Sequence, residues 1–117
     1  MIQTMQQLIQ QYVSNIHDIY GSHLRQIILY GSYARGDFRS DSDVDIMILL
    51  DLSDMDIKQY RHQLSDMTFD FNMDYDVDIK PIAKSEEHYR KWMASYPFYS
   101  NIANEGTVLW SEEQSDI

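Results

Sequence analysis

The segment from Asp43 to Leu50 constrains the fold more than any other part of the chain. Its first residues alternate aspartate with Val44 and Ile46, and its later residues are wholly apolar. Alternation with a period of two is typical of a strand with one buried face. The segment therefore predicts a strand in which Asp43 and Asp45 share one face with Asp41, while the intervening apolar residues point to the core.

The rest of the chain predicts further helices and strands without internal repeats. The expected elements are a helix over residues 2–20, strands over 25–30 and 43–50, a helix over 53–71, a strand over 76–82, helices over 85–95 and up to 104, and a strand over 107–110. Residues 31–42 are predicted to be a turn-rich connection. Because the first two strands are expected to pair as a hairpin, this order predicts an α+β fold, a small mixed β-sheet with helices packed on it.

Size and composition indicate one globular domain. The chain has 117 residues, 44% of them hydrophobic, and no cysteine. We expect residues 1–110 to form the domain and residues 111–117 to be a mobile acidic tail. No window has the ~20 consecutive apolar residues of a membrane helix, and the first residues do not resemble a signal peptide. The sequence therefore predicts a cytoplasmic protein without membrane contacts.

The charge balance disfavours nucleic acid as a direct partner. Nine Lys and Arg residues stand against 19 Asp and Glu residues, a formal charge of −10. A field of this sign repels phosphate backbones and attracts metal cations and basic proteins. We expect no basic groove, which argues against nucleic-acid polymerisation.

A second group of aspartates repeats the pattern on the third predicted strand. Asp74, Asp76 and Asp78 are expected to share one face of that strand. Aspartates stacked on neighbouring strands repel one another, so they need either open water or a cation. Mg²⁺ prefers such carboxylate oxygens, and two ions about 3.5–4 Å apart can serve one phosphoryl transfer. For residues 74–78 alone a solvated edge is the simpler interpretation, whereas Asp43 and Asp45 favour the metal.

What favours the metal is the turn that precedes Asp43. Gly31 ends a predicted strand, and a glycine lets a phosphate approach the backbone closely. Ser32 offers a hydroxyl and an N–H to phosphate oxygens. Arg35 or Arg39 could neutralise a departing pyrophosphate. Gly-Ser at a strand end, ten residues from Tyr33 to Ser42, and then Asp-Val-Asp form a pattern that predicts nucleotide chemistry.

This pattern resembles the nucleotidyltransferase superfamily that includes DNA polymerase β and the aminoglycoside nucleotidyltransferases. The sequence Gly-Ser-Tyr-Ala-Arg-Gly, followed by Ser-Asp-Val-Asp-Ile, looks like the motifs of the minimal nucleotidyltransferases of bacteria and archaea. The likeness continues in Val77-Asp78-Ile79, in Tyr96-Pro97-Phe98 and up to Glu105-Gly106. It covers residues from about 25 to 110, and it implies the polymerase β palm-like fold.

The resemblance implies a role for each matched residue. Gly31, Ser32 and Arg35 would bind the triphosphate of ATP. Asp43, Asp45 and Asp78 would be catalytic and would hold two Mg²⁺ ions, for which Mn²⁺ could substitute. Asp76 remains an alternative third carboxylate. The implied reaction is in-line attack of an acceptor hydroxyl on the α-phosphorus, with pyrophosphate leaving. The histidines His17, His23, His62 and His88 are scattered outside the motif.

The resemblance also implies a partner. Minimal nucleotidyltransferases are similar to the antitoxins of two-gene systems in which the toxin is a HEPN-domain RNase, and the family's activity is adenylylation of a tyrosine on that toxin. An aromatic cluster that includes Trp92, Tyr96 and Phe98 could dock such a partner, or it could simply cover the sheet. Two alternatives stay open at this point: an antitoxin that neutralises by binding alone, and a transferase that modifies a small molecule such as an antibiotic.

Overall fold

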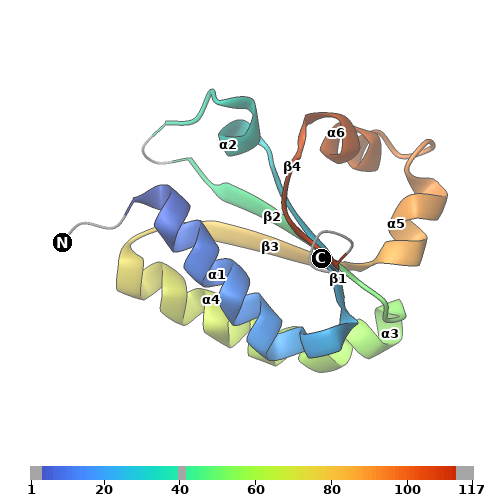
Figure 1. Ribbon diagram of the computed structural model, residues 1–117, viewed down its shortest axis with the longest axis horizontal. Helices are drawn as coiled ribbons and strands as arrows, with labels where there is room; N and C mark the ends of the chain where they lie inside the picture. The colour runs from blue at the N-terminus through green and yellow to red at the C-terminus, as the bar shows by residue number, and fades with distance from the viewer. Residues whose placement is uncertain (1–3, 40–41, 113–117) are drawn as a thin grey trace.

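The computed structural model describes residues 4–39 and 42–112, and four strands in these ranges form one sheet. The strands are β1 (Leu24–Tyr30), β2 (Val44–Leu50), β3 (Ile79–Ser85) and β4 (Thr107–Ser111), in the spatial order β3-β2-β1-β4. β1 pairs antiparallel with both β2 and β4, whereas β2 pairs parallel with β3 (Figure 1). The mixed sheet and the antiparallel pairing of the first two strands confirm the predicted α+β class.

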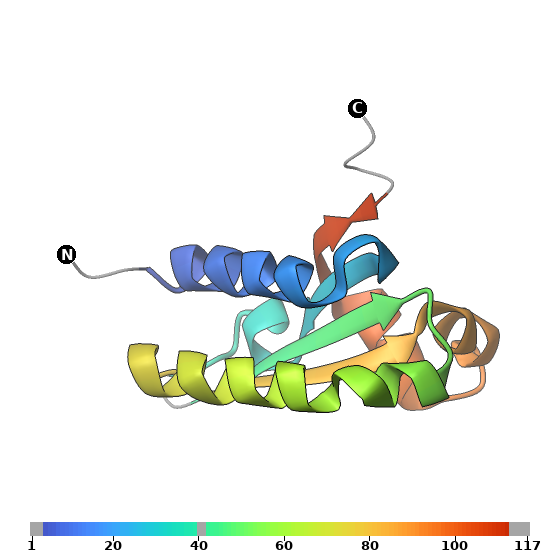
Figure 2. The same ribbon diagram turned by 90° about the horizontal axis from the view of Figure 1, so that it is seen from below.

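Helices cover both faces of the sheet. The helices are α1 (Met5–Tyr20), α2 (Ser32–Arg35), α3 (Asp54–Ile57), α4 (Arg61–Tyr75), α5 (Glu86–Trp92) and α6 (Pro97–Glu105), with 3₁₀ turns at Gly21–His23 and Lys58–Tyr60. α1 and α4 run side by side over one face (Figure 2), and α5 and α6 lie on the other. Within the described residues, no helix is both long enough and apolar enough to cross a membrane.

β2 is buried on both of its faces, which explains its apolar run. Ile46 and Ile48 pack in the cluster beneath α1 and α4, and Met47 and Leu49 pack in the cluster beneath α5 and α6. Only Asp45 interrupts the buried pattern of this strand. Packing on both faces therefore holds the first residues of β2 in place, and with them the carboxylate of Asp45.

Several predicted boundaries are confirmed by capping contacts. Ser53 accepts a hydrogen bond from the N–H of Asp56 at the start of α3, and Ser85 accepts one from the N–H of His88 at the start of α5. Gly21 ends α1 with a positive φ of 56°. The helix predicted over residues 2–20 buries Leu8, Ile9, Tyr12, Ile16 and Tyr20, while Ile2 lies outside the described residues.

The prediction that residues 74, 76 and 78 share one strand face is wrong. α4 continues to Tyr75, so Asp74 belongs to the helix, and Asp76 caps it in the left-handed conformation (φ 53°). β3 begins only at Ile79, which exchanges two hydrogen bonds with the Asn72 side chain, at 2.9 and 3.1 Å. This clamp fixes where the helix ends and the strand begins, and aspartate tolerates the left-handed turn between them.

The sequence also missed the short helix α2 and placed other strand ends differently: β2 begins at Val44, and β3 continues to Ser85. β1 begins at Leu24, and β4 includes Ser111, a residue that we assigned to the tail. Pro81 lies in the middle of β3, where it is tolerated because β3 is an edge strand. Asp41 and residues 113–117 lie outside the described residues.

Candidate functional site

The turn after β1 lies directly against Asp45. Tyr30, the last residue of β1, pairs with Asp45 across the sheet, and Gly31 follows with φ 76° and ψ −154°. A Cβ on Gly31 would overlap the Oδ2 atom of Asp45 and would lie 3.2 Å from its Cγ. Glycine is therefore required twice, for the backbone conformation and for the space that the carboxylate occupies.

Asp43 and Asp78 precede two strands that pair in parallel. Val44 is in register with Ile79, and the N–H of Val44 donates to the carbonyl oxygen of Asp78 at 2.9 Å. The Asp43 and Asp78 side chains lie close enough for each to shift the pKa of the other. Parallel pairing thus joins two carboxylates that are far apart in the sequence. The structure brings Asp43, Asp45 and Asp78 together at the amino ends of β2 and β3.

Lys80 belongs to the same cluster, although this lysine was not predicted from the sequence. Its Nζ lies 3.0 Å from Oδ2 of Asp43, and Lys80 is in register with Asp45. The available signal was its place two residues after Asp78, since residues two apart on an extended chain point to the same side. The lysine supplies the cation that the crowded carboxylates require.

Crowding perturbs the titration of all four groups. The hydrogen bonds from Lys80 and Asp78 lower the pKa of Asp43, while the hydrogen bond to Asp43 raises the pKa of Asp78. Burial, followed by the charge of Asp43, raises the pKa of Asp45. The hydrogen bond to Asp43 raises the pKa of Lys80. The cluster therefore carries more negative charge than one ammonium neutralises, which is an arrangement that favours cation binding.

The donor set fits Mg²⁺ or Mn²⁺, although the side chains are not arranged as a preformed site. Among the described residues, no three His, Asp or Glu side chains form a group that could hold a metal ion as they stand. Instead, Lys80 forms an ion pair with Asp43, and Asp78 lies close enough to the same carboxylate to shift its pKa. Three carboxylates supply the hard oxygen ligands that such ions prefer. The fit is therefore one of ligand chemistry and proximity.

The residues predicted to bind the triphosphate flank this cluster. Ser32 is the first residue of α2 and is partly exposed. Arg35 forms ion pairs with Asp37 at 3.3 Å and with Glu105 at 3.6 Å. Its positive charge partly opposes the rise in the pKa of Asp45. The backbone N–H of Arg39 donates to Ser42 Oγ at 2.7 Å.

The two candidates for the third carboxylate are separated by their contacts. Asp76 and Asp78 both line a cavity of about 360 Å³, together with Tyr33 and Ser42. Asp78 also reaches Asp43, whereas Asp76 caps α4. The geometry therefore favours Asp78 over Asp76 as the partner of Asp43.

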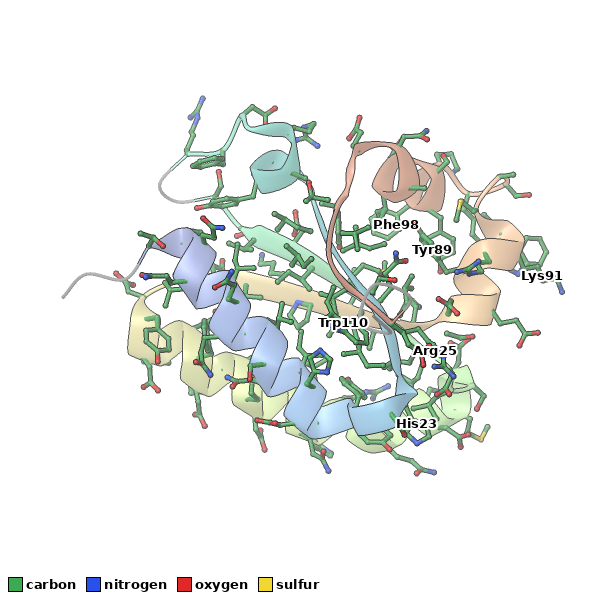
Figure 3. The ribbon with its side chains drawn as sticks, viewed as in Figure 1. His23, Arg25, Tyr89, Lys91, Phe98 and Trp110 are labelled. Carbon is green, nitrogen blue, oxygen red and sulfur yellow. The ribbon has the colours of Figure 1, made fainter. Side chains whose placement is uncertain are left out.

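An aromatic cluster covers the sheet face beside this site. Tyr30 meets Phe98 edge-on with ring centroids 5.8 Å apart, and Trp92 stacks on Tyr96 at 5.5 Å. Figure 3 places Tyr89 and Phe98 on the side of the sheet that α5 and α6 cover. Tyr89 is buried, whereas Phe98 and Tyr96 are about half exposed. The cluster thus covers the sheet and also leaves aromatic surface accessible.

A mixed sheet that gathers carboxylates from two parallel strands beside a Gly-Ser turn has the architecture of a nucleotidyltransferase. The family model described as "Polymerase beta, Nucleotidyltransferase" matches residues 7–115, and the chain belongs to this family.

Known proteins resemble the chain over most of its length. It is 35% identical over 102 residues to the "Putative protein adenylyltransferase MJ0604" of Methanocaldococcus jannaschii, covering 87% of this chain and 94% of that protein. A second protein of the same organism with the same description is 33% identical over 88% of this chain and 96% of its own length.

Solved structures share the fold at lower sequence identity. "A putative nucleotidyltransferase from Sulfolobus solfataricus" superposes with a TM-score of 0.59 at 17% identity, over 92% of this chain and 83% of that one. The "toxin-antitoxin MntA-HepT" gives 0.52 at 17% identity, over 96% and 77%. A "toxin-antitoxin with AMP-PNP" gives 0.53 at 21% identity, over 92% and 76%. These likenesses support the fold.

Proposed function

We propose that the chain is a metal-dependent protein adenylyltransferase, which moves AMP from ATP to a hydroxyl of a partner protein. The observation that carries the proposal is the contact of the Gly31 turn with Asp45, beside Asp43 and Asp78, which parallel pairing of β2 and β3 brings together. A glycine turn next to clustered carboxylates suits a substrate that brings both phosphates and their metal ions. Membership of the nucleotidyltransferase family supports the same chemistry.

In this proposal each side chain has a defined task. Gly31 and Ser32 bind the triphosphate at the turn, and Arg35 offsets charge on the departing pyrophosphate. Asp43, Asp45 and Asp78 hold the two Mg²⁺ ions, which would neutralise phosphate charge and lower the pKa of the attacking hydroxyl. Asp78 would also accept the hydroxyl's proton once the site is assembled. The protein's contribution is position and charge rather than a covalent intermediate.

The relatives support a protein as the acceptor. Both M. jannaschii proteins are described as protein adenylyltransferases, and two of the structural neighbours are toxin–antitoxin complexes, one of them with the ATP analogue AMP-PNP. We therefore propose that the acceptor is a tyrosine of a HEPN-type toxin and that its adenylylation neutralises the toxin. The half-exposed Tyr96 and Phe98 offer aromatic surface for that partner beside the site.

The proposal is tested by transfer to the partner. The pure chain would be incubated with ATP labelled at the α-phosphate, Mg²⁺ and the product of the neighbouring gene, and the mass of each protein would be measured. We expect an AMP increment on a partner tyrosine. The double substitution Asp43→Asn/Asp45→Asn should abolish it, because amides replace two of the three carboxylates.

A matched control separates the site from net charge. The substitutions Asp66→Asn and Asp70→Asn make the same charge change on the exposed surface of α4 and should leave transfer intact. If the wild-type chain transfers no nucleotide with Mg²⁺ or Mn²⁺ and yet forms a tight complex that silences the toxin, the function is neutralisation by binding alone. If instead a small-molecule alcohol is the only substrate that gains AMP, the protein acceptor is wrong.

A further inference from the structure

We propose that the chain has a second ligand site, a basic pocket at the opposite end of the sheet from the aspartates, which binds a phosphorylated small molecule of nucleotide size. We define the basic pocket by Lys58, Arg61 and Lys84, which line one cavity of about 460 Å³. The net charge of −10 led us to expect no basic groove, yet these three residues, from the 3₁₀ turn, from α4 and from β3, line one cavity. The fold gathers them.

The charge of the basic pocket is unusual for this chain. The protein carries nine Lys and Arg residues and a net charge of −10, yet three of those cations line one cavity. Elsewhere Arg25, Arg35, Lys80 and Arg90 each form an ion pair with a carboxylate. By contrast, no ion pair joins any of the three pocket cations to another residue that the structure describes.

One carboxylate lines the pocket, but it does not neutralise the charge of the three cations. Asp54 lies at the start of α3, and none of the three cations comes close enough to form an ion pair with it within the described residues. Three cations and one carboxylate leave a positive cavity on an acidic protein. A cavity lined by three cations without an ion-pair partner among the described residues favours an anionic ligand.

The walls of the pocket indicate the kind of anion. Arg61 offers a planar fork of donors that matches phosphate oxygens, and Lys58 and Lys84 are further phosphate-binding cations. The remaining wall is apolar and is built from Tyr20, Ile57 and Leu64 among others. A volume of about 460 Å³ is typical of sites for small organic ligands. Phosphates at the cations and an apolar or aromatic part against Tyr20 would fill this shape.

The basic pocket is separate from the proposed transfer site. Asp78 lies before β3 and Lys84 near its end, and six residues of extended chain span roughly 20 Å. The two sites also differ in sign, because the aspartate cluster repels phosphate when no metal ion is present. Removing divalent metal therefore leaves the basic pocket as the favoured place for a phosphate anion.

The test uses tripolyphosphate as the probe and excess EDTA to remove metal. The full chain, labelled with ¹⁵N, would be titrated at fixed ionic strength while its amide resonances are followed. We expect saturable shifts around Ile57–Arg61 and Lys84. The double substitution Lys58→Gln/Arg61→Gln should weaken binding at least about tenfold. A parallel titration with ATP measures what the nucleoside adds, and we expect tighter binding than tripolyphosphate if it contacts the apolar wall.

The control removes the same two charges elsewhere. Arg90→Gln/Lys91→Gln lies on α5, where Lys91 points away from the body of the molecule (Figure 3), and it should leave binding within about twofold. The single substitution Lys84→Gln provides a second loss-of-binding variant if the double variant is unfolded.

The proposal of a ligand site in the basic pocket is overturned if tripolyphosphate binding does not saturate, or if the control variant loses binding equally. It is also overturned if the shifts centre on Gly31–Arg35. None of these outcomes contradicts the transfer of AMP to a partner, and shifts centred on Gly31–Arg35 would support it, so the two proposals fail independently.

Discussion

Gly31 and Asp45 are in contact across the first two strands, and no side chain larger than hydrogen fits between them. Gly31 follows the strand residue that pairs with Asp45, so the sheet itself sets the approach. The turn that we propose for phosphate and the carboxylate that we propose for metal are therefore parts of one rigid unit.

Substitution of Gly31 should separate catalysis from folding. Gly31→Ala would push the Asp45 carboxylate out of place, and a misplacement of about 1 Å can lower a rate by about 100-fold. The alanine would also be strained at a positive φ, at a cost of about 1–3 kcal/mol. We expect a nearly complete loss of AMP transfer in a protein that still unfolds cooperatively in urea. The measurements are the transfer rate and the free energy of unfolding.

Gly21 supplies the matched control for this experiment. It has a similar backbone conformation (φ 56°, ψ −130°), but a Cβ there would meet nothing within 4 Å. Gly21→Ala should therefore lose comparable stability and keep its transfer rate. Equal losses of rate in the two variants would mean that strain alone, and not the displaced carboxylate, is responsible.

Replacing Asp45 should stabilise the metal-free protein at neutral pH. Burial and the charge of Asp43 raise the pKa of Asp45 above its ordinary value of 3.8, so the ionised form destabilises the folded state. Stability from the protonated form is complete below the unfolded pKa and is lost as pH rises through the folded pKa. We expect Asp45→Asn to melt at a higher temperature than wild type in EDTA at pH 7, with the difference vanishing towards pH 4. Added Mg²⁺ should stabilise only the wild type.

The comparison variant is Asp66→Asn, which makes the same charge change on an exposed part of α4. A rise in melting temperature of the same size in this variant would attribute the effect to net charge, and the prediction for Asp45 would be wrong.

Lys80 should compete with metal ions for Asp43. Its Nζ lies 3.0 Å from Oδ2 of Asp43, so a divalent ion bound to the same carboxylate would lie close to the ammonium group and be repelled by it. We expect Lys80→Met to bind Mn²⁺ several-fold more tightly than wild type in the absence of nucleotide, as measured by electron paramagnetic resonance. Lys84→Met removes a charge from the same strand at the far end and should leave the affinity unchanged. Weaker Mn²⁺ binding in Lys80→Met would mean that the lysine positions the carboxylates.

A buried hydrogen bond joins the two helices of one face. The hydroxyls of Tyr12 on α1 and Thr68 on α4 are 2.6 Å apart in a site from which water is excluded. Tyr12→Phe should lower the free energy of unfolding by about 1–3 kcal/mol, because Thr68 then loses its partner. The double variant with Thr68→Val removes both polar groups and should recover part of that loss. Additive losses in a urea-denaturation cycle would contradict this coupling.

Local patterns in the sequence were sufficient for most of the fold. The strand β2, the helix α1 and the starts of the helical segments after Ser53 and Ser85 depend on neighbours close in the chain, and each was predicted correctly. The boundary at Asp76 was not, because a strand-like alternation over 76–82 competes with the clamp between Asn72 and Ile79. That clamp forms only when the helix and the strand are already packed.

The functional site, too, was predicted from the sequence only in part. The proximity of Asp43 and Asp45 follows from the period of a strand, and the family pattern pointed to Asp78. The contact of Lys80 with Asp43 depends on the register between β2 and β3, which one sequence does not reveal. The basic pocket depends on the packing of a 3₁₀ turn, a helix and a strand end, and its three cations have no common spacing.

β3 is an edge strand, held to the sheet by β2 alone, and Asp78 immediately precedes it. If this strand detached while the rest of the domain stayed folded, Asp78 would leave Asp43, and the pair of carboxylates would be divided. Local opening of an edge strand requires less free energy than global unfolding, so the pairing of these carboxylates depends on the stability of one edge. A bound ion that bridged Asp43 and Asp78 would therefore hold the edge strand β3 against β2, in the centre of the sheet.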